Sequence, residues 1–528
     1  MDANAIHRRR YAILAVLCLS LFLIVVDNTI TNVALPTLVR ELHASNTQLA
    51  WVVDAYSLVF AGLLLAMGSL GDRYGRKGAL TIGLIVFTTF STVAAFMHSP
   101  GQLIAARAVM GVGAALIFPA TLAILANVFT DPRERAKAIG IWAAVTGAAV
   151  ALGPISGGFL LQHFWWGSVF FVNLPIGLLA LVAGRVLVPT SRDPNAPRLD
   201  LRGAALSIAS ITGLIYAIIE APKHGWLSTT TLSLFAAALV ALAVFVWWER
   251  RIDNPMLDVS VVASARFSAA SGAVTLAFFA LFGFIFMLTQ YLQFVRGYGT
   301  LAAGVRTLPF AIATGIAAPL SPRLAQRFGT KRIVSAGLAL MSGGLVIAAT
   351  VGATTPYRVI ALSAIVMGAG LGLTTSPATE SIMGSLPKEK AGVGSAVNDT
   401  TREVGGTLGV AVISSLLASV YASRLDDGLR NLPLPAEARA AARESIGAAF
   451  AVAERATQTA GPQAGQLIRQ TASSAFVDGF HLGAWVAAAV ALAGSLAALR
   501  FLPAHAGPAP VADTVAQRAV DDMVAIGR

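Results

Sequence analysis

The chain has 528 residues, of which 56% are hydrophobic and only 12% are charged. Soluble domains carry about 25% charged residues, so this composition excludes a disordered chain and argues against an ordinary soluble enzyme. The net charge of +12 would point to nucleic acid in a soluble protein. The single cysteine, Cys18, permits neither a disulfide framework nor a cysteine metal site within the chain.

Hydrophobic segments long enough to cross a bilayer recur along the whole chain. A transmembrane helix needs about 20 mostly apolar residues, and fourteen segments meet that requirement. The first is too long for the hydrophobic region of a signal peptide and is expected to remain as a span. The predicted spans are residues 11–35, 49–70, 79–97, 102–127, 139–160, 170–188, 203–220, 229–248, 267–294, 301–320, 333–350, 358–379, 394–420 and 477–502.

The basic residues between these spans indicate the orientation of the chain. On the side of the N-terminus there are 25 Lys and Arg residues, against 10 on the other side, six of which lie in one long loop. Basic residues concentrate on the cytoplasmic side of membrane proteins, so both termini are predicted to be cytoplasmic. The basic charge is then explained by topology, and no nucleic-acid partner is expected.

The two halves of the chain contain a similar turn. After the second span the sequence reads Gly71-Asp72-Arg73-Tyr74-Gly75-Arg76-Lys77, and after the tenth it reads Ala325-Gln326-Arg327-Phe328-Gly329-Thr330-Lys331. Arg, an aromatic residue, Gly and Lys recur in register, which indicates an internal duplication. Chance is the alternative, because basic turns are common on the cytoplasmic side of any membrane protein.

The duplication predicts an all-α polytopic membrane protein with two six-helix bundles and two inserted spans. The first bundle is predicted over residues 1–188, the linker with the extra spans over 189–262, the second bundle over 263–502, and a cytoplasmic tail over 503–528. An outer loop at about 421–475 interrupts the second bundle. A helix starting at Pro435, a break at Gly461-Pro462 and a second short helix over 465–475 would make it a helical hairpin, and disorder is the alternative.

The first turn combines an acidic residue with a cluster of cations at a helix end. Such a cluster can latch two helices together and release them again, because an exposed ion pair contributes only about 0–1 kcal/mol. A plain cytoplasmic turn would explain the basic residues but not the glycine spacing with an aspartate. The candidate gating residues are Gly68, Asp72, Arg73, Gly75, Arg76 and Lys77, with Arg327 and Lys331 in the second half.

The fifth span carries closely spaced small residues around a proline. Glycines four apart lie on one helical face and let a neighbouring helix approach closely, and the proline removes one backbone hydrogen bond. A generic packing face is the alternative. The residues concerned are Gly147, Gly153, Pro154, Gly157 and Gly158.

Ionisable residues inside the spans are the candidates for coupling and binding. Asp27, Asp54 and Arg107 fall in the outer half of the bilayer, and a charge there costs at least about 2.5–3.5 kcal/mol, so Arg107 is expected to have an acidic partner. Two carboxylates sharing a cavity with one arginine would leave one carboxylate able to exchange a proton or hold a cation. A purely structural Asp–Arg pair is the alternative.

A second charged group enters the thirteenth span. Asp399, Arg402 and Glu403 are three and four residues apart, so they can meet on one helical face. Glu403 lies near mid-membrane and is the better candidate for function, whereas Asp399 and Arg402 can form an ion pair. A neutralised local pair is the alternative.

Four segments together resemble the major facilitator superfamily, and within it the fourteen-span drug:proton antiporters of the EmrB/QacA type. The turn at 68–78 resembles the superfamily signature, and residues 147–158 are similar to the antiporter motif of its drug exporters. Residues 27–36 and 107–119 look like the signatures of the first and fourth spans. Two features depart from the pattern: Gln326 stands where the first half has Asp72, and the loop at 421–475 is long.

The resemblance implies a proton-coupled exporter of hydrophobic and cationic compounds that works by alternating access in a bacterial cytoplasmic membrane. It implies no enzyme activity, no metal site and no cofactor, with the proton gradient as energy source. The expected partners are small hydrophobic or cationic substrates, protons and the lipid bilayer, and a monomer is expected. Export of one metabolite, lipid or self-made antibiotic is the alternative, and an uptake symporter, membrane enzyme or channel fits less well.

Overall fold

The computed structural model describes residues 3–42, 46–192, 200–252, 255, 262, 264–386, 391–430, 432 and 434–504. These residues form helices joined by short turns, and none of them lies in a β-strand. The all-α fold predicted from the sequence is confirmed for this part of the chain.

The first group of helices packs around its own hydrophobic core, whose members come almost entirely from residues 13–188. Local sequence signals set the helix ends: Asp131 precedes Pro132 and accepts hydrogen bonds from the backbone N–H groups of Arg133 and Glu134, both at 2.9 Å. The helices are α1 (Ala3–Leu42), α2 (Asn46–Tyr74), α3 (Arg76–Ala94), α4 (Pro100–Val128), α5 (Pro132–His163), α6 (Ser168–Phe171) and α7 (Asn173–Leu187).

Two further helices, α8 (Leu201–His224) and α9 (Thr229–Glu249), follow this group and pack against each other. Helix α8 also contacts α2, and a small core that includes Leu65, Ala204 and Phe245 joins the three helices. The outer face of α9 exposes Leu239 and Val240. An apolar helix surface of this kind suits contact with lipid chains.

The second group packs around a separate core built from residues 267–502. The two cores agree with the duplication predicted from the sequence, while the exact domain boundaries stay a prediction. The helices are α10 (Ala265–Gln290) with the π-helical turn η2 (Tyr291–Val295), α11 (Thr300–Val305), α12 (Leu308–Phe328), α13 (Thr330–Ala348), α14 (Tyr357–Met383), α15 (Ala391–Gly428) and α18 (Pro462–Phe501).

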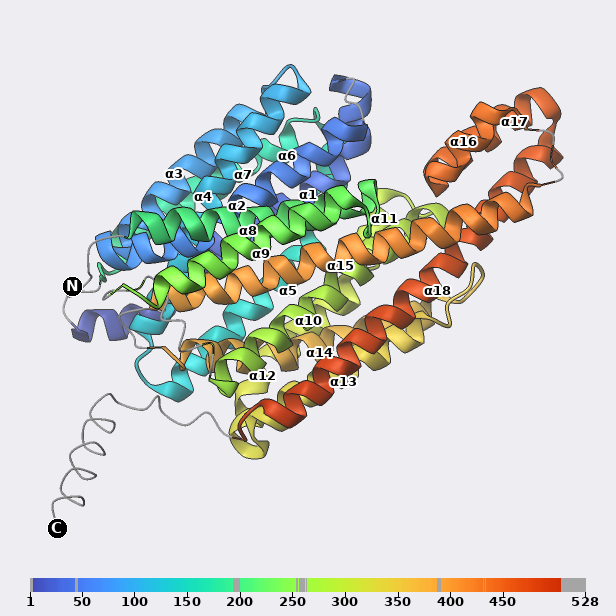
Figure 1. Ribbon diagram of the computed structural model, residues 1–528. Coiled ribbons are helices and arrows are strands. Elements are labelled where there is room, and N and C mark those ends of the chain that lie inside the picture. The colour runs from blue at the N-terminus through green and yellow to red at the C-terminus, as the bar shows by residue number, and fades with distance from the viewer. Residues whose placement is uncertain are drawn as a thin grey trace, which may run out of the picture.

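The long loop is a helical hairpin formed by α16 (Ala436–Glu444) and α17 (Ile446–Ala460), which stands at one end of the molecule (Figure 1). Ser445 separates the two helices and caps α17 by accepting a hydrogen bond from the Ala448 N–H at 3.1 Å. Tyr421 fastens the hairpin to α15 by donating to the Ala442 carbonyl at 3.0 Å. The predicted separate helix over 465–475 is wrong, because those residues form the first turns of the continuous helix α18.

Fourteen segments of the described residues are long and apolar enough to cross a membrane. They coincide with the fourteen spans predicted from the sequence, and the largest difference is the last, where the helix starts at residue 462 instead of 477. Helix α1 begins and α18 ends at the same end of the bundle, opposite the hairpin (Figure 1). Most of the predicted tail, residues 505–528, lies outside the described part of the chain.

The two similar turns have the same backbone conformation. Gly75 has φ 117° and ψ 123°, and Gly329 has φ 91° and ψ 142°. Residues with a side chain rarely adopt positive φ values of this kind. In both halves the glycine therefore permits a sharp junction between successive helices, which supports the duplication independently of the basic residues.

Candidate functional site

A cavity with an empty volume of about 640 Å³, counted with its opening, lies between the two groups of helices. Helices α1, α2, α4 and α5 line one side, and α10 and α15 line the other. Eight of the cavity's fifteen lining residues are apolar and seven are polar or charged, and sites that bind small molecules likewise combine an apolar surface with placed polar groups. Its aromatic and charged residues are Tyr56, Phe60, Phe118, Phe278, Phe282, Asp399, Arg402 and Glu403.

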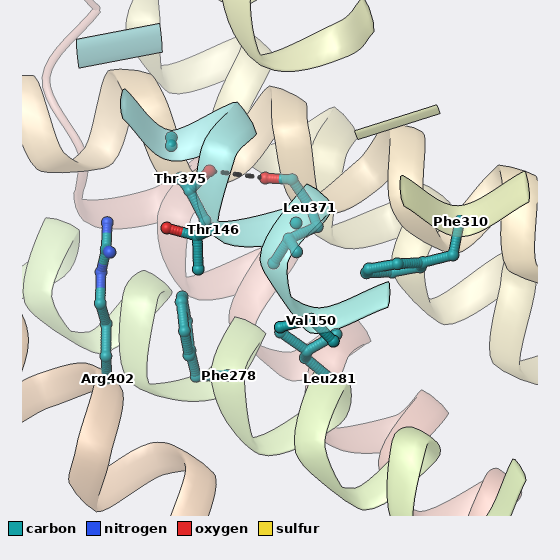
Figure 2. Close-up of a pocket in the computed structure, with 10 residues that line it drawn as sticks. Thr146, Val150, Phe278, Leu281, Phe310, Leu371, Thr375 and Arg402 are labelled. Atoms are coloured by element: carbon teal, nitrogen blue, oxygen red, sulfur yellow. Dashed lines mark hydrogen bonds between the residues drawn. The ribbon is translucent and has the colours of Figure 1, made fainter. Parts of the chain in front are cut away.

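A smaller hollow, with an empty volume of about 300 Å³ counted with its opening, adjoins this cavity. The residues that line both are Thr146, Val150, Phe278, Leu281 and Arg402. Figure 2 shows the Arg402 side chain extended beside the Phe278 ring, with Thr146 next to it. Pro154 has no N–H group, so the carbonyl of Val150, one turn earlier in α5, lacks its usual helical donor. Pro154 therefore removes one backbone hydrogen bond from a helix that forms part of the cavity wall.

The three charged residues of α15 lie together in the cavity, as their spacing predicts. The Asp399 carboxylate accepts hydrogen bonds from the Asn398 amide at 3.0 Å and the Ser395 hydroxyl at 3.3 Å. Glu403 accepts a hydrogen bond from Ser57 of α2. The cavity thus contains two carboxylates whose hydrogen bonds come from neutral groups.

Arg402 is buried and is held mainly by aromatic rings. Its guanidinium carbon lies 4.7 Å from the Trp142 ring centroid and 5.1 Å from that of Phe278, within the range of cation–π attraction. One terminal nitrogen donates to the Thr379 hydroxyl at 3.2 Å, and Nε has no hydrogen-bond partner among the described residues. The predicted direct ion pair is absent: among the described residues, no nitrogen of Arg402 lies within 4.0 Å of an Asp399 oxygen. The guanidinium packs against the two rings instead.

Asp27 and Arg107 form a fully buried ion pair in the first bundle. Arg107 donates to one carboxylate oxygen at 2.5 Å, and Asn173 of α7 donates to the other at 2.7 Å. Arg107 also donates to the Val52 carbonyl at 3.1 Å, and its guanidinium lies 4.3 Å from the Tyr56 ring centroid. The predicted acidic partner of Arg107 is confirmed, and it is Asp27.

The predicted shared cavity of Asp27, Asp54 and Arg107 needs correction. Asp54 is half-buried on α2, and none of the three residues lines the central cavity. Tyr56 stands between the Asp27–Arg107 pair and the cavity, since it contacts Arg107 and also forms part of the cavity wall. The carboxylates that face the cavity come instead from α15.

The turn at residues 68–77, which holds the candidate gating residues, joins the two bundles. Asp72 accepts hydrogen bonds from the Arg76 guanidinium at 2.6 and 2.7 Å. Its other oxygen accepts from the backbone N–H of Val393 at 3.1 Å, in the first turn of α15. Helix N-termini attract negative charge, so Asp72 binds α2 to α15. In the second turn Gln326 and Thr330 replace Asp72 and Arg76, which removes both charges of this pair.

The other predicted gating residues lie around the same turn. Lys77 donates to the Arg185 carbonyl at the end of α7 at 2.8 Å. Arg73 and Arg327 lie over the rings of their neighbours Tyr74 and Phe328. Gly68 and Gly75 are buried, and Lys331 is half-buried at the start of α13.

A second contact between the bundles was not expected from the sequence, where Glu380 is simply a residue near a span end. Arg135 at the start of α5 donates to the Glu380 carboxylate of α14 at 2.6 and 3.0 Å. The pair lies at the same end of the bundle as Asp72 and is largely buried, with side-chain exposures of 16% and 15%. No local motif indicates this pair, because its members are 245 residues apart.

The glycines of the fifth span contact both bundles. A methyl group at Gly153 would overlap Thr29 of α1, and one at Gly157 would lie 2.8 Å from Ile30. On the other face, a methyl group at Gly147 would lie 2.8 Å from Thr314 of α12. Gly158 and Pro154 pack against α11. Helix α5 therefore lies between the first bundle and the second, and close packing on both faces requires the small residues.

These features define a class of protein: a polytopic membrane transporter in which two helical bundles enclose a charged cavity between them. The chain belongs to the Major Facilitator Superfamily, whose family model matches residues 17–410. It is accordingly a multi-pass protein of the membrane.

Curated relatives match nearly the whole chain. The multidrug efflux pump LfrA of Mycolicibacterium smegmatis is 39% identical over 92% of this chain and 95% of its own length. The tetracenomycin C resistance and export protein of Streptomyces glaucescens is 33% identical, with 94% and 92% covered.

Solved structures show the same fold at low identity. A bacterial homologue of the human lysosomal transporter Spinster, in an inward-facing conformation, aligns with a TM-score of 0.57 and 18% identity over 94% of this chain and 98% of that chain.

Proposed function

We propose that the protein is a proton-coupled multidrug exporter that carries hydrophobic cations out of a bacterial cell by alternating access. The observation that carries this proposal is the cavity between the bundles, where the Asp399 and Glu403 carboxylates stand among aromatic side chains. Aromatic faces and carboxylates together attract lipophilic cations. The efflux pump LfrA, with 39% identity over 92% of this chain, supports the same direction of transport.

Proton coupling at this site follows from competition for the same carboxylates. A proton on Glu403 removes the negative charge that would hold a cation, so proton and substrate exclude each other. Release of the proton on the other side of the membrane restores the charge and allows the next substrate to bind. Asp27 is proposed as a second coupling residue, because protonation there would release Arg107 from its ion pair.

The alternation is proposed to depend on the contacts that join the bundles at one end. The Asp72–Val393 hydrogen bond and the Arg135–Glu380 ion pair hold this end closed. Because the basic residues of the sequence gather on this side, we place it in the cytoplasm. Opening of both contacts would give the cytoplasm access to the cavity.

The proposed transport needs no cofactor, metal or partner chain, and we propose a monomer in the lipid bilayer. The domain limits proposed are those of the duplication, with the bundles over residues 1–188 and 263–502.

The test is transport by purified protein in liposomes with an imposed pH gradient, using a panel of lipophilic cations such as ethidium and tetraphenylphosphonium. Wild type is expected to move cations against their gradient, and Glu403→Gln is expected to abolish this pH-driven transport. Two results would each refute the proposal: no gradient-driven movement of any cation by wild type, or unchanged transport by Glu403→Gln.

Export of one self-made antibiotic is a second candidate, because the tetracenomycin C export protein matches 94% of this chain. An uncharged aromatic antibiotic added to the same liposomes distinguishes the two. Transport of that compound alone would favour the narrow exporter, and transport of several unrelated cations would favour the multidrug exporter.

A further inference from the structure

The wall of the cavity between the bundles contains more acidic than basic side chains. Three side chains in its wall carry a charge at neutral pH, all from α15: Asp399, Arg402 and Glu403, while the Tyr56 hydroxyl of α2 is neutral there. Arginine keeps its positive charge under all physiological conditions. When both carboxylates are ionised, the cavity therefore has a net charge of −1, which one proton or one singly charged cation neutralises.

Charged groups on the surrounding helices do not change this count. Asp27 and Arg107 neutralise each other at 2.5 Å behind the Tyr56 ring. Asp54 of α2 does not belong to the cavity wall, and Asp72 is paired with Arg76 at the end of α2.

The position of Arg402 adds a second effect to the charge count. Its guanidinium lies against Trp142 and Phe278, and Phe278 is also part of the cavity wall. A positive charge is thus already present beside an aromatic surface that a substrate would use. Since no carboxylate in the described residues lies within 4.0 Å of Arg402, its charge acts on the cavity without a direct ion pair to mask it.

We infer that Arg402 is a specificity-determining residue that restricts the transported cations to a single positive charge. The inference rests on the proposed function and names its substrate class. A singly charged cation leaves the cavity neutral, whereas a doubly charged one leaves one uncompensated charge inside the membrane. Such a charge is strongly disfavoured, so we expect discrimination of at least about tenfold between otherwise similar cations.

The experiment compares ethidium, which has one positive charge, with propidium, which has the same ring system and two. Both dyes are titrated by fluorescence against purified protein in lipid nanodiscs. The variants are Arg402→Met, which removes the charge, and Arg402→Lys, which keeps it as a matched control. Because the ratio of the two dissociation constants is compared between variants, the difference in dye size cancels.

Wild type and Arg402→Lys are expected to bind ethidium at least about tenfold more tightly than propidium, and Arg402→Met is expected to reduce that ratio by about tenfold. An unchanged ratio in Arg402→Met overturns the inference, as does equal binding of the two dyes by wild type. If Arg402→Met binds neither dye, Arg402→Gln is measured against the same criterion. The ratio is obtained from binding alone, so failure of pH-driven ethidium transport by wild type refutes the proposed function separately.

Discussion

The buried pair of Asp27 and Arg107 allows a test of whether a charge inside the membrane serves stability or coupling. Both side chains are fully buried and 2.5 Å apart. Removing one partner of such a pair leaves an uncompensated charge and costs about 3–5 kcal/mol, whereas replacing both is often nearly neutral. Asp27→Asn leaves the Arg107 guanidinium with the Val52 carbonyl and the Tyr56 ring.

Those remaining contacts offset only part of the loss, because a cation–π contact contributes about 0.5–2 kcal/mol. We therefore expect Asp27→Asn to destabilise the protein by about 2–4 kcal/mol. Arg107→Gln removes the positive charge, and Asp27 then keeps only its hydrogen bond from Asn173 at 2.7 Å. The double variant is expected to lie within about 1 kcal/mol of wild type, so that the cycle gives a large coupling energy.

The assay is thermal unfolding of the four proteins in one detergent, followed by pH-driven ethidium transport in liposomes. Additive destabilisation in the double variant would refute the reasoning, because it would mean that the two charges do not compensate each other. Transport then separates the roles. Recovery of both stability and transport in the double variant would make the pair structural, whereas recovery of stability alone would support a coupling role for Asp27.

Three further predictions use other parts of the molecule. Gly153→Ala is expected to destabilise the protein by about 1–3 kcal/mol, because the added methyl group overlaps Thr29. Gly272→Ala is the control and is expected to be neutral or slightly stabilising, because its methyl group meets no atom within 4 Å. Equal melting temperatures of the two variants would contradict this prediction. Thr146 lines the cavity, so a Thr146→Cys variant in a Cys18→Ser background reports access to it. Glu380→Gln is expected to raise the rate at which a thiol reagent, added on the side of the Arg135–Glu380 contact, labels that cysteine. An unchanged rate would show that the contact is not a latch. If Glu403 alone exchanges a proton, one proton moves against one singly charged cation and no net charge crosses the membrane. An imposed potential of about 100 mV, worth about 2.3 kcal/mol per charge, should then leave steady-state ethidium accumulation unchanged. A shift of about fiftyfold would instead indicate a second proton.

Features that depend on local sequence were predicted well. Fourteen spans follow from hydrophobic length alone, because a bilayer imposes the same minimum on every helix. The matching glycines at 75 and 329 were recognisable because a positive φ limits the residue type. The spacing of Asp399, Arg402 and Glu403 was sufficient to place them on one face of α15, since helical periodicity is local.

Partners far apart in the sequence required the tertiary structure. The sequence indicated that Arg107 needs an acid, but only the packing of α1 against α4 selects Asp27 over Asp54, and Asn173 supplies the remaining hydrogen bond. The Arg135–Glu380 contact joins residues that no motif connects.

The sequence by itself determined the number of spans, the repeated turn and the set of charges inside the membrane, because each follows from local hydrophobicity and helical spacing. Only the tertiary structure decided which charges neutralise each other and which face the cavity. It assigned Asp27 and Arg107 to a closed pair, and it left Arg402 against two aromatic rings beside the carboxylates of Asp399 and Glu403. The physical reason is that electrostatic pairing depends on distance and burial, which are set by the packing of helices far apart in the chain.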